Sequence, residues 1–319
     1  MPVDPEGTTG PTKGQARGPT WRRTTPGLYV PASVDAAVVE QRIREQSMRL
    51  TSGAVTGWAA LRLHGGGFFD GLGPDGRTVR PVPVVVGGDR IRPCADIHQS
   101  RHRLRPHEVV VRHGIRCTTP ERAVIDEIRR LDDVREGVVT LDMACAARLT
   151  SISRVRTVVL GVGGRRLDTV RTALGLAHER SRSPWESRLR LLWEIDLGWS
   201  RPLCNWAILD RDGQLLGKPD LLGPELGLVA EYDGALHRTR SRHRRDVRRE
   251  EAFRRAGLEV VTFVAGDLDE TAAAMSRLQA ARERAGRPGT WVLGATPSPS
   301  LDELLDQRDW LRGLADDAS

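Results

Sequence analysis

Two apolar segments that lie close together in the chain each carry carboxylates, and this pattern constrains the fold more than any other feature. The segments span residues 217–222 (GKPDLL) and 228–234 (LVAEYDG). Burying a charge costs several kcal/mol unless a partner compensates it. A divalent cation is the partner that we expect for Asp220 and Glu231.

The spacing predicts an antiparallel hairpin of strands 217–222 and 228–233, closed by a turn at 224–227. In this register Asp220 lies opposite Glu231. Directly opposed residues have Cβ atoms roughly 4.5–5.5 Å apart, which suits two carboxylates that share one Mg²⁺ or Mn²⁺ ion through oxygen ligands.

Side chains alternate along a strand, so Lys218, Asp220, Glu231 and Asp233 are expected on one face. His237 follows four residues after Asp233 and could reach the same place. The alternative is a hairpin whose acids are solvated on an outer face, with His237 in the next loop. The apolar neighbours of both acids favour central strands.

The surrounding pattern predicts a helix, three strands, a helix and a strand. A helix is expected over 184–197 with Ser183 as its N-cap, because Ser183 precedes Pro184 and apolar residues recur at helical spacing. A strand at 206–209 and a turn at 210–213 precede the acidic strands. A helix over 241–256, ended by Gly257, and a strand at 258–264 follow them.

Residues 183–268 resemble the PD-(D/E)XK nuclease superfamily, most closely its branch related to the very short patch repair endonucleases. The resemblance is carried by Glu186, Pro219-Asp220, the EYDG segment 231–234, His237, Asp246 with Arg249, and the AGLEVVTF segment 256–263. It implies a restriction-endonuclease-like αβββαβ core and metal-dependent hydrolysis of DNA phosphodiesters. Asp233 stands where the superfamily has a lysine, although an acid followed by glycine and a nearby histidine is usual in this branch.

These residues can support that chemistry. Asp220, Glu231 and Asp233 are the expected ligands of Mg²⁺ or Mn²⁺, which would polarise a phosphate oxygen and activate water. His237 is the candidate for proton transfer. Glu186, in the helix before the strands, is expected to face the cleft that holds Asp220 and Glu231. Lys218 is one of only two lysines among 49 basic residues and could replace the missing motif lysine, or it stands there by chance.

An arginine-rich stretch follows the acidic strands. Residues 238–255 contain nine arginines and three acids, a net charge of +6. We expect contacts with the DNA backbone, because each neutralised phosphate adds affinity that depends on salt and not on sequence. The alternative is a solvated helix face in an arginine-rich proteome. The candidate residues are Arg238, Arg240, Arg244, Arg245, Arg248 and Arg249.

Composition agrees with a nucleic-acid partner. The chain has 319 residues, a net charge of +7 and a pI near 10.0. There is no apolar run of membrane-spanning length and no signal-peptide pattern, so we expect a cytoplasmic protein without a membrane partner. The four widely spaced cysteines are typical of buried thiols, and the histidines between 64 and 113 are too scattered for a metal cluster.

The expected fold class is α/β (α+β), with a mixed N-terminal domain followed by the nuclease-like core. We predict a disordered basic tail at 1–25, a mixed α+β domain at 26–180, the endonuclease-like domain at 181–290 and a helical tail at 291–319. The segments 27–30, 52–65 and 114–123 resemble the AbiEi-type antitoxin domain of bacterial abortive-infection systems. That resemblance implies a protein partner for the N-terminal domain. The roughly 25 residues before it are too short to form the winged helix-turn-helix that usually opens the family, which speaks against sequence-specific promoter binding.

Two functions follow from these observations. The first is a metal-dependent DNA endonuclease or nickase acting in defence or repair. The second is a non-catalytic DNA-binding regulator or antitoxin with a degenerate nuclease fold. Retention of Asp220, Glu231, Asp233 and His237 favours the enzyme.

Overall fold

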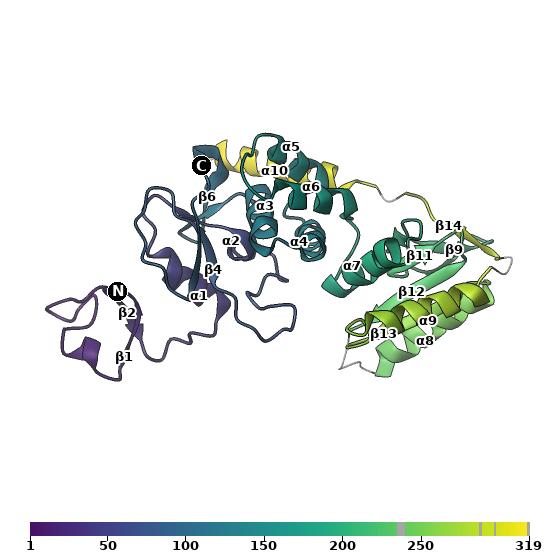
Figure 1. Cartoon of the computed structure of the whole chain (residues 1–319), viewed down its shortest axis with the longest axis horizontal. Coiled ribbons are helices and arrows are strands. Elements are labelled where there is room, and N and C mark those ends of the chain that lie inside the picture. The colour runs from purple at the N-terminus through teal and green to yellow at the C-terminus, as the bar shows by residue number, and fades with distance from the viewer. Residues whose placement is uncertain (235–239, 287–288, 297, 318–319) are drawn as a thin grey trace. The chain divides into compact units, whose positions relative to one another are not determined.

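The computed structural model describes residues 1–234, 240–286, 289–296 and 298–317; the side chains of 240–245 and 315–317 lie outside that description. The chain forms two units (Figure 1). Unit 1 comprises residues 1–133 and 153–170, and unit 2 comprises 134–152 and 171–319. Both mix helices and strands, which confirms the expected α+β class. None of the described helices is long and apolar enough to span a bilayer.

Unit 1 is built on a five-stranded sheet with the order β5-β4-β3-β7-β6. The sheet combines antiparallel pairs with parallel pairs between β3 and β7 and between β4 and β5. Its strands are β3 (Ala54–Val55), β4 (Val82–Val85), β5 (Ile97–Ser100), β6 (Val109–Arg112) and β7 (Ile115–Thr118). Its helical elements are α1 (Val39–Ser47), α2 (Gly57–Leu63), η2 (Pro106–Glu108), α3 (Pro120–Leu131) and α5 (Ile152–Leu160).

The first 25 residues contain regular structure, in contrast to the predicted disordered tail. The short helix η1 (Gln15–Arg17) precedes strand β1 (Trp21–Thr25), which pairs with β2 (Leu28–Pro31). The Asp4 carboxylate accepts hydrogen bonds from the backbone N–H groups of Glu6, Thr8 and Thr9. These local hydrogen bonds give the backbone N–H groups of this loop an acceptor. Composition alone predicts a flexible segment here.

Unit 2 contains two sheets. The larger has the order β13-β12-β11-β8, with strands β8 (Leu203–Cys204), β11 (Leu221–Gly223), β12 (Leu228–Asp233) and β13 (Glu259–Val264). The smaller has the order β10-β9-β14, with strands β9 (Ile208–Asp210), β10 (Leu215–Gly217) and β14 (Trp291–Leu293). The helices are α4 (Val134–Ala146), α7 (Pro184–Leu191), the π-helical η3 (Leu192–Asp196), α8 (Arg240–Arg255), α9 (Thr271–Arg284) and α10 (Leu301–Asp317). Helix α6 (Leu167–Leu176) crosses the boundary between the units.

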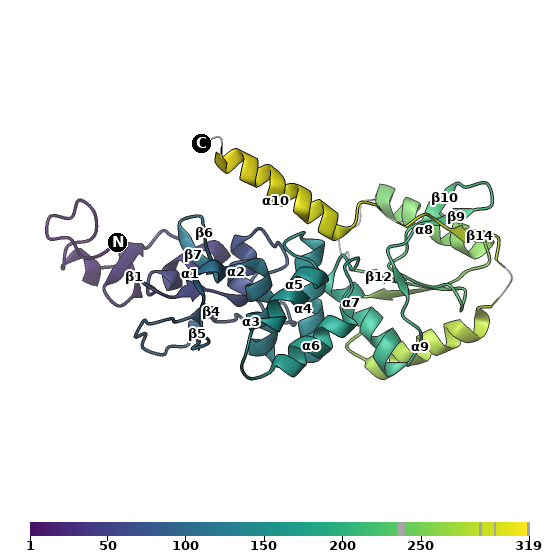
Figure 2. The same ribbon diagram turned by 90° about the horizontal axis from the view of Figure 1, so that it is seen from above.

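Apolar side chains cover both faces of the larger sheet. Leu221, Leu228 and Ala230 pack on one face with residues of α7, η3 and α9, including Trp193 and Leu278. Leu222 and Val229 pack on the opposite face with Phe253 of α8. Figure 2 shows α8 and α9 on opposite sides of β12. The sheet is therefore central, and polar groups near its strand ends lose much of their contact with water.

Helix α4 belongs to the C-terminal unit, which moves the division away from the predicted boundary near residue 180. A buried ion pair lies between α4 and α7: Arg190 of α7 contacts Asp142 of α4 at 2.9 Å, and both side chains are completely buried. The Ser187 hydroxyl also donates to Asp142. A guanidinium and a carboxylate enclosed together hold the two helices in one core.

Three further predictions of elements differ from the structure. The expected strand 217–222 is broken at 218–220, so that β10 joins the smaller sheet and β11 the larger. Residues 291–293, expected in a helical tail, form β14 beside β9, with the helix beginning only at Leu301. The region 134–180 holds α4, α5 and α6 and not two helices.

Candidate functional site

The predicted register of the acidic hairpin is confirmed. Gly223 pairs with Leu228, and Leu221 pairs with Ala230. One residue further along, Asp220 lies opposite Glu231. By strand alternation Glu231 follows Val229 onto the face covered by α8, whereas Asp220 immediately precedes β11 and is placed by its hydrogen bond to β12.

The Asp220 carboxyl group is fixed by the neighbouring strand. Its Oδ2 atom accepts a hydrogen bond from the backbone N–H of Tyr232 at 2.8 Å. Burial raises the pKa of Asp220 to about 7, and the nearby charges of Glu186 and Glu231 act in the same direction. The Tyr232 N–H and the Arg249 guanidinium oppose the shift without cancelling it. Asp220 therefore lies among negative charges that lack enough positive compensation.

Glu186 is positioned by the start of α7. Ser183 caps this helix by accepting a hydrogen bond from the Glu186 backbone N–H, as the sequence predicts. The Glu186 Oε2 atom accepts from the Arg182 backbone N–H at 2.8 Å and from Asn205 Nδ2 at 2.9 Å. Glu186 is buried, so these bonds fix a carboxylate beside Asp220.

Glu231 is paired with the helix that crosses its face. Arg249 of α8 donates through Nη2 to Glu231 Oε2 at 3.0 Å, and the same nitrogen lies 3.6 Å from Asp246 Oδ1. Burial nevertheless raises the pKa of Glu231, because desolvation outweighs the attraction of Arg249. Glu231 Oε1 and Arg249 Nε are buried without hydrogen-bond partners among the described residues.

An aromatic stack supports the other side of β12. The rings of Tyr232 and Trp185 are stacked with centroids 5.3 Å apart and an angle of 11°. The Arg188 guanidinium lies 4.7 Å from the Trp185 ring. The stack therefore connects β12, next to Glu231, to the first turn of α7, next to Glu186. The sequence reasoning missed Trp185 and Asn205; the tryptophan next to Glu186 at the helix start was the available signal for the first.

The remaining predicted site residues do not all join this group. Lys218 is exposed in the segment between β10 and β11. This segment is not a strand, so strand alternation does not place Lys218 on the face of Asp220, in contrast to the prediction. Asp233 ends β12 and is partly buried.

His237 and Arg238 lie outside the described residues, as do the side chains of Arg240, Arg244 and Arg245. Arg248 is exposed on α8, whereas Arg249 is bound to Glu231 and is thus an internal partner of the acids.

The described residues contain no group of three or more histidine, cysteine or acidic side chains positioned to hold a metal ion. Mg²⁺, however, is usually bound by one or two carboxylates, with water and substrate phosphates completing its shell. Within the described part of the chain Glu231 Oε1 has no partner, and the hydrogen bond of Asp220 occupies only Oδ2. One oxygen atom from each of the two carboxylates is thus available, and this donor set fits a hard divalent cation.

No family model matches the chain, and neither a curated protein nor a solved structure was found to be similar to it. The function of the site is therefore argued from its geometry.

Proposed function

We propose that the protein is a metal-dependent DNA endonuclease or nickase whose site is formed by Asp220, Glu231 and Glu186. The observation that carries this proposal is that the buried Asp220 carboxyl group feels the negative charges of both Glu186 and Glu231, and that Asp220 and Glu231 each keep one oxygen atom without a hydrogen bond among the described residues. Such a set of charges is unfavourable by itself and favourable around a cation.

Mg²⁺ or Mn²⁺ held there would polarise a phosphate oxygen and lower the pKa of a water molecule. Asp220 and Glu231 would each contribute one oxygen atom. The Tyr232 N–H orients the Asp220 carboxylate, and Asn205 orients Glu186. Arg249 holds Glu231 in place through their ion pair.

The other predicted residues have supporting roles in the proposal. Asp233 ends the same strand as Glu231 and could add a ligand. His237 stays the candidate for proton transfer, and Lys218 supplies an exposed ammonium group two residues before Asp220. The arginines of α8 would bind the DNA backbone on either side of the scissile phosphate.

Cleavage assays test the proposal. Plasmid, short duplexes and single strands are incubated with the protein in Mg²⁺, in Mn²⁺ or in chelator. We expect cleavage that requires metal and that is lost in Asp220→Asn and Glu231→Gln. Asp212→Asn is the matched control, because Asp212 is an exposed acid in the turn between β9 and β10.

A second function is a DNA-binding regulator or antitoxin that has lost catalysis, with a protein partner bound through its N-terminal unit. It is favoured by the ion pair between Arg249 and Glu231, which occupies a carboxylate that an active site would give to the metal. If the wild type binds DNA but cleaves no nucleic acid with either metal, and its melting temperature does not respond to metal, this function replaces the enzyme.

A further inference from the structure

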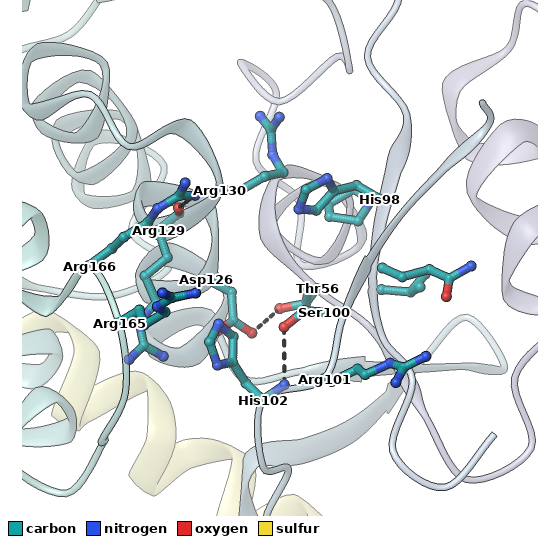
Figure 3. A pocket seen from close by; sticks show the side chains of 13 residues that line it. Thr56, His98, Ser100, Arg101, His102, Asp126, Arg129, Arg130, Arg165 and Arg166 are labelled. Atoms are coloured by element: carbon teal, nitrogen blue, oxygen red, sulfur yellow. Dashed lines mark hydrogen bonds between the residues drawn. The ribbon is translucent and has the colours of Figure 1, made fainter. Parts of the chain in front are cut away.

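Unit 1 contains a cavity that is separate from the acidic hairpin and has the opposite charge. Its volume is about 780 Å³, and it is bounded by β4, β5, α3 and the segment between α5 and α6 (Figure 3). Cavities of this size hold small organic ligands. Five arginines line it: Arg101, Arg129, Arg130, Arg165 and Arg166. Among the described lining residues the only acid is Asp126.

The charge of Asp126 is already compensated within the fold. Its Oδ1 atom accepts from Arg122 Nε at 2.9 Å, and its Oδ2 atom accepts from the Thr56 hydroxyl at 2.7 Å. Arg122 is buried with it and also contacts Glu108 at 2.9 Å. Asp126 therefore belongs to a structural ion-pair network, and its hydrogen bonds are used by Arg122 and Thr56.

Two of the lining arginines are also compensated. Arg130 donates to both carboxylate oxygens of Glu127, and Arg166 contacts Asp132 at 2.9 Å. Of the other three, Arg101 and Arg165 form no ion pair in the described ranges, and Arg129 has only the electrostatic attraction of Asp126. Arg101 and Arg165 are exposed at the rim, and Arg129 lies within the wall. The cavity thus retains an excess of positive charge.

Arg129 is the strongest indication that a ligand binds. Its side chain is almost completely buried, with a relative exposure of 3% for the residue. The Nη2 atom donates to the Gly163 carbonyl at 2.7 Å, but Nε and Nη1 have no acceptor among the described residues. Leaving a buried charged donor unsatisfied costs more free energy than leaving a neutral one unsatisfied. An anion in the cavity would supply the missing acceptor.

Two histidines add hydrogen-bonding groups without adding charge. Partial desolvation lowers the pKa of His102, with Arg129 and Arg122 acting in the same direction against Asp126. Desolvation also lowers the pKa of His98, beside Arg130 and Arg166. Figure 3 shows His102 next to Asp126 and Arg165 on one side of the cavity and His98 on the other. At neutral pH each imidazole can donate to or accept from a ligand.

We propose that this cavity binds the phosphate group of a phosphorylated small molecule of about mononucleotide size. Arg129 and Arg165 form the phosphate subsite, with His102 beside them. A phosphate monoester carries a charge of about −1.5 to −2 at pH 7 and several acceptor oxygens, which matches uncompensated guanidinium groups. The volume exceeds that of phosphate alone, and Pro83 and Val84 provide an apolar wall for the organic part.

Calorimetry and thermal shift with the full-length protein test this site. The probes are inorganic phosphate, adenosine 5′-monophosphate and adenosine. We expect phosphate to bind and to raise the melting temperature, the nucleotide to bind more tightly than phosphate, and adenosine to bind at least tenfold more weakly than the nucleotide. Arg165→Gln should weaken binding of both phosphate-containing probes about tenfold, because it removes a hydrogen bond to a charged group.

Controls keep the result interpretable. Arg129→Gln should abolish phosphate binding but could also unfold the unit, so exposed Arg165 carries the test and circular dichroism checks both variants. Arg77→Gln removes an exposed arginine outside the cavity lining and should leave binding unchanged. Absence of phosphate binding, or equal affinity in Arg165→Gln, would overturn the proposal. With a 5′-phosphorylated oligonucleotide as a fourth probe, binding of the oligonucleotide without binding of adenosine 5′-monophosphate would overturn the small molecule in favour of a nucleic-acid end.

Discussion

The backbone N–H of Tyr232 donates to the Asp220 carboxylate at 2.8 Å, so that the strand carrying Glu231 also fixes the acid opposite it. This single bond ties the orientation of one carboxylate to the strand that holds the other. The charge of Glu231 raises the pKa of the Asp220 carboxyl group held in this way, and uptake of a proton or a cation would relieve the repulsion.

The first prediction concerns pH. The pKa of Asp220 is about 7 in the folded protein, well above its ordinary value, so the folded state holds this proton more tightly than the unfolded state. Protonation of Asp220 therefore stabilises the folded state fully below about pH 4, and this stabilisation disappears as the pH rises through 7. The free energy of unfolding changes by about 1.4 kcal/mol for each unit by which the pKa differs between the folded and unfolded states. Without metal, Asp220→Asn should therefore lose less stability than the wild type between pH 5 and pH 8 in urea unfolding.

The second prediction concerns metal binding in the absence of DNA. Mg²⁺ or Mn²⁺ at about one hundred times its dissociation constant should stabilise the wild type by about 2.7 kcal/mol, because it binds the folded state. Thermal unfolding with and without chelator measures this shift. Asp220→Asn should lose the shift while Asp212→Asn keeps it, and an equal response of all three proteins would mean that the metal binds elsewhere.

The third prediction concerns Arg249. Arg249→Gln leaves Glu231 without its cation, and we expect a loss of roughly 1–3 kcal/mol in the free energy of unfolding. The loss should be larger at pH 8 than at pH 5, because the pKa of Glu231 is already raised and protonation relieves the unpaired charge at low pH. The exposed Arg248→Gln is the matched control on the same helix. Equal stability of both variants at pH 8 would refute a structural role for Arg249.

The fourth prediction concerns DNA affinity. Replacing Arg240, Arg244, Arg245 and Arg248 together with glutamine should weaken binding to every sequence. The slope of log affinity against log salt should fall in magnitude by about 0.9 for each phosphate that the variant no longer neutralises. Arg249 is left in place because it stabilises Glu231. Fluorescence anisotropy over a salt series measures the slope, and an unchanged slope would assign these residues to a solvated face.

The fifth prediction concerns the buried pair between α4 and α7. Arg190→Met leaves the Asp142 charge enclosed without its partner and should cost about 3–5 kcal/mol in chemical denaturation. Arg135→Met, which breaks the partly exposed contact with Asp196, should cost at most about 1 kcal/mol. Similar losses in the two variants would show that burial does not set the energy of these pairs.

Much of the second unit could be predicted because its signals are local. The pairing of Gly223 with Leu228 followed from strand period and turn length, and the N-cap at Ser183 followed from its position before Pro184. The end of α8 followed from Gly257, which adopts a φ of 92°. Each of these features depends on residues a few positions apart.

The features that sequence reasoning missed depend on interactions between distant segments. The break at 218–220 arises because β10 pairs with β9 while β11 pairs with β12. Asn205 reaches Glu186 across nineteen residues, and Arg249 reaches Glu231 across eighteen. A count of charges assigned Arg249 to DNA, but a partly buried acid on a neighbouring strand uses it inside the protein.

The parallel pairing of β12 with β13 gives the site an order of assembly. Parallel strands require a crossover, and here the crossover contains α8, which carries Arg249. The hairpin that brings Asp220 opposite Glu231 closes over only four residues, whereas the crossover must close a much longer loop. We therefore expect the two acids to meet before their guanidinium partner arrives, so that a chain folding at low pH or with a divalent cation present would face less repulsion during that interval.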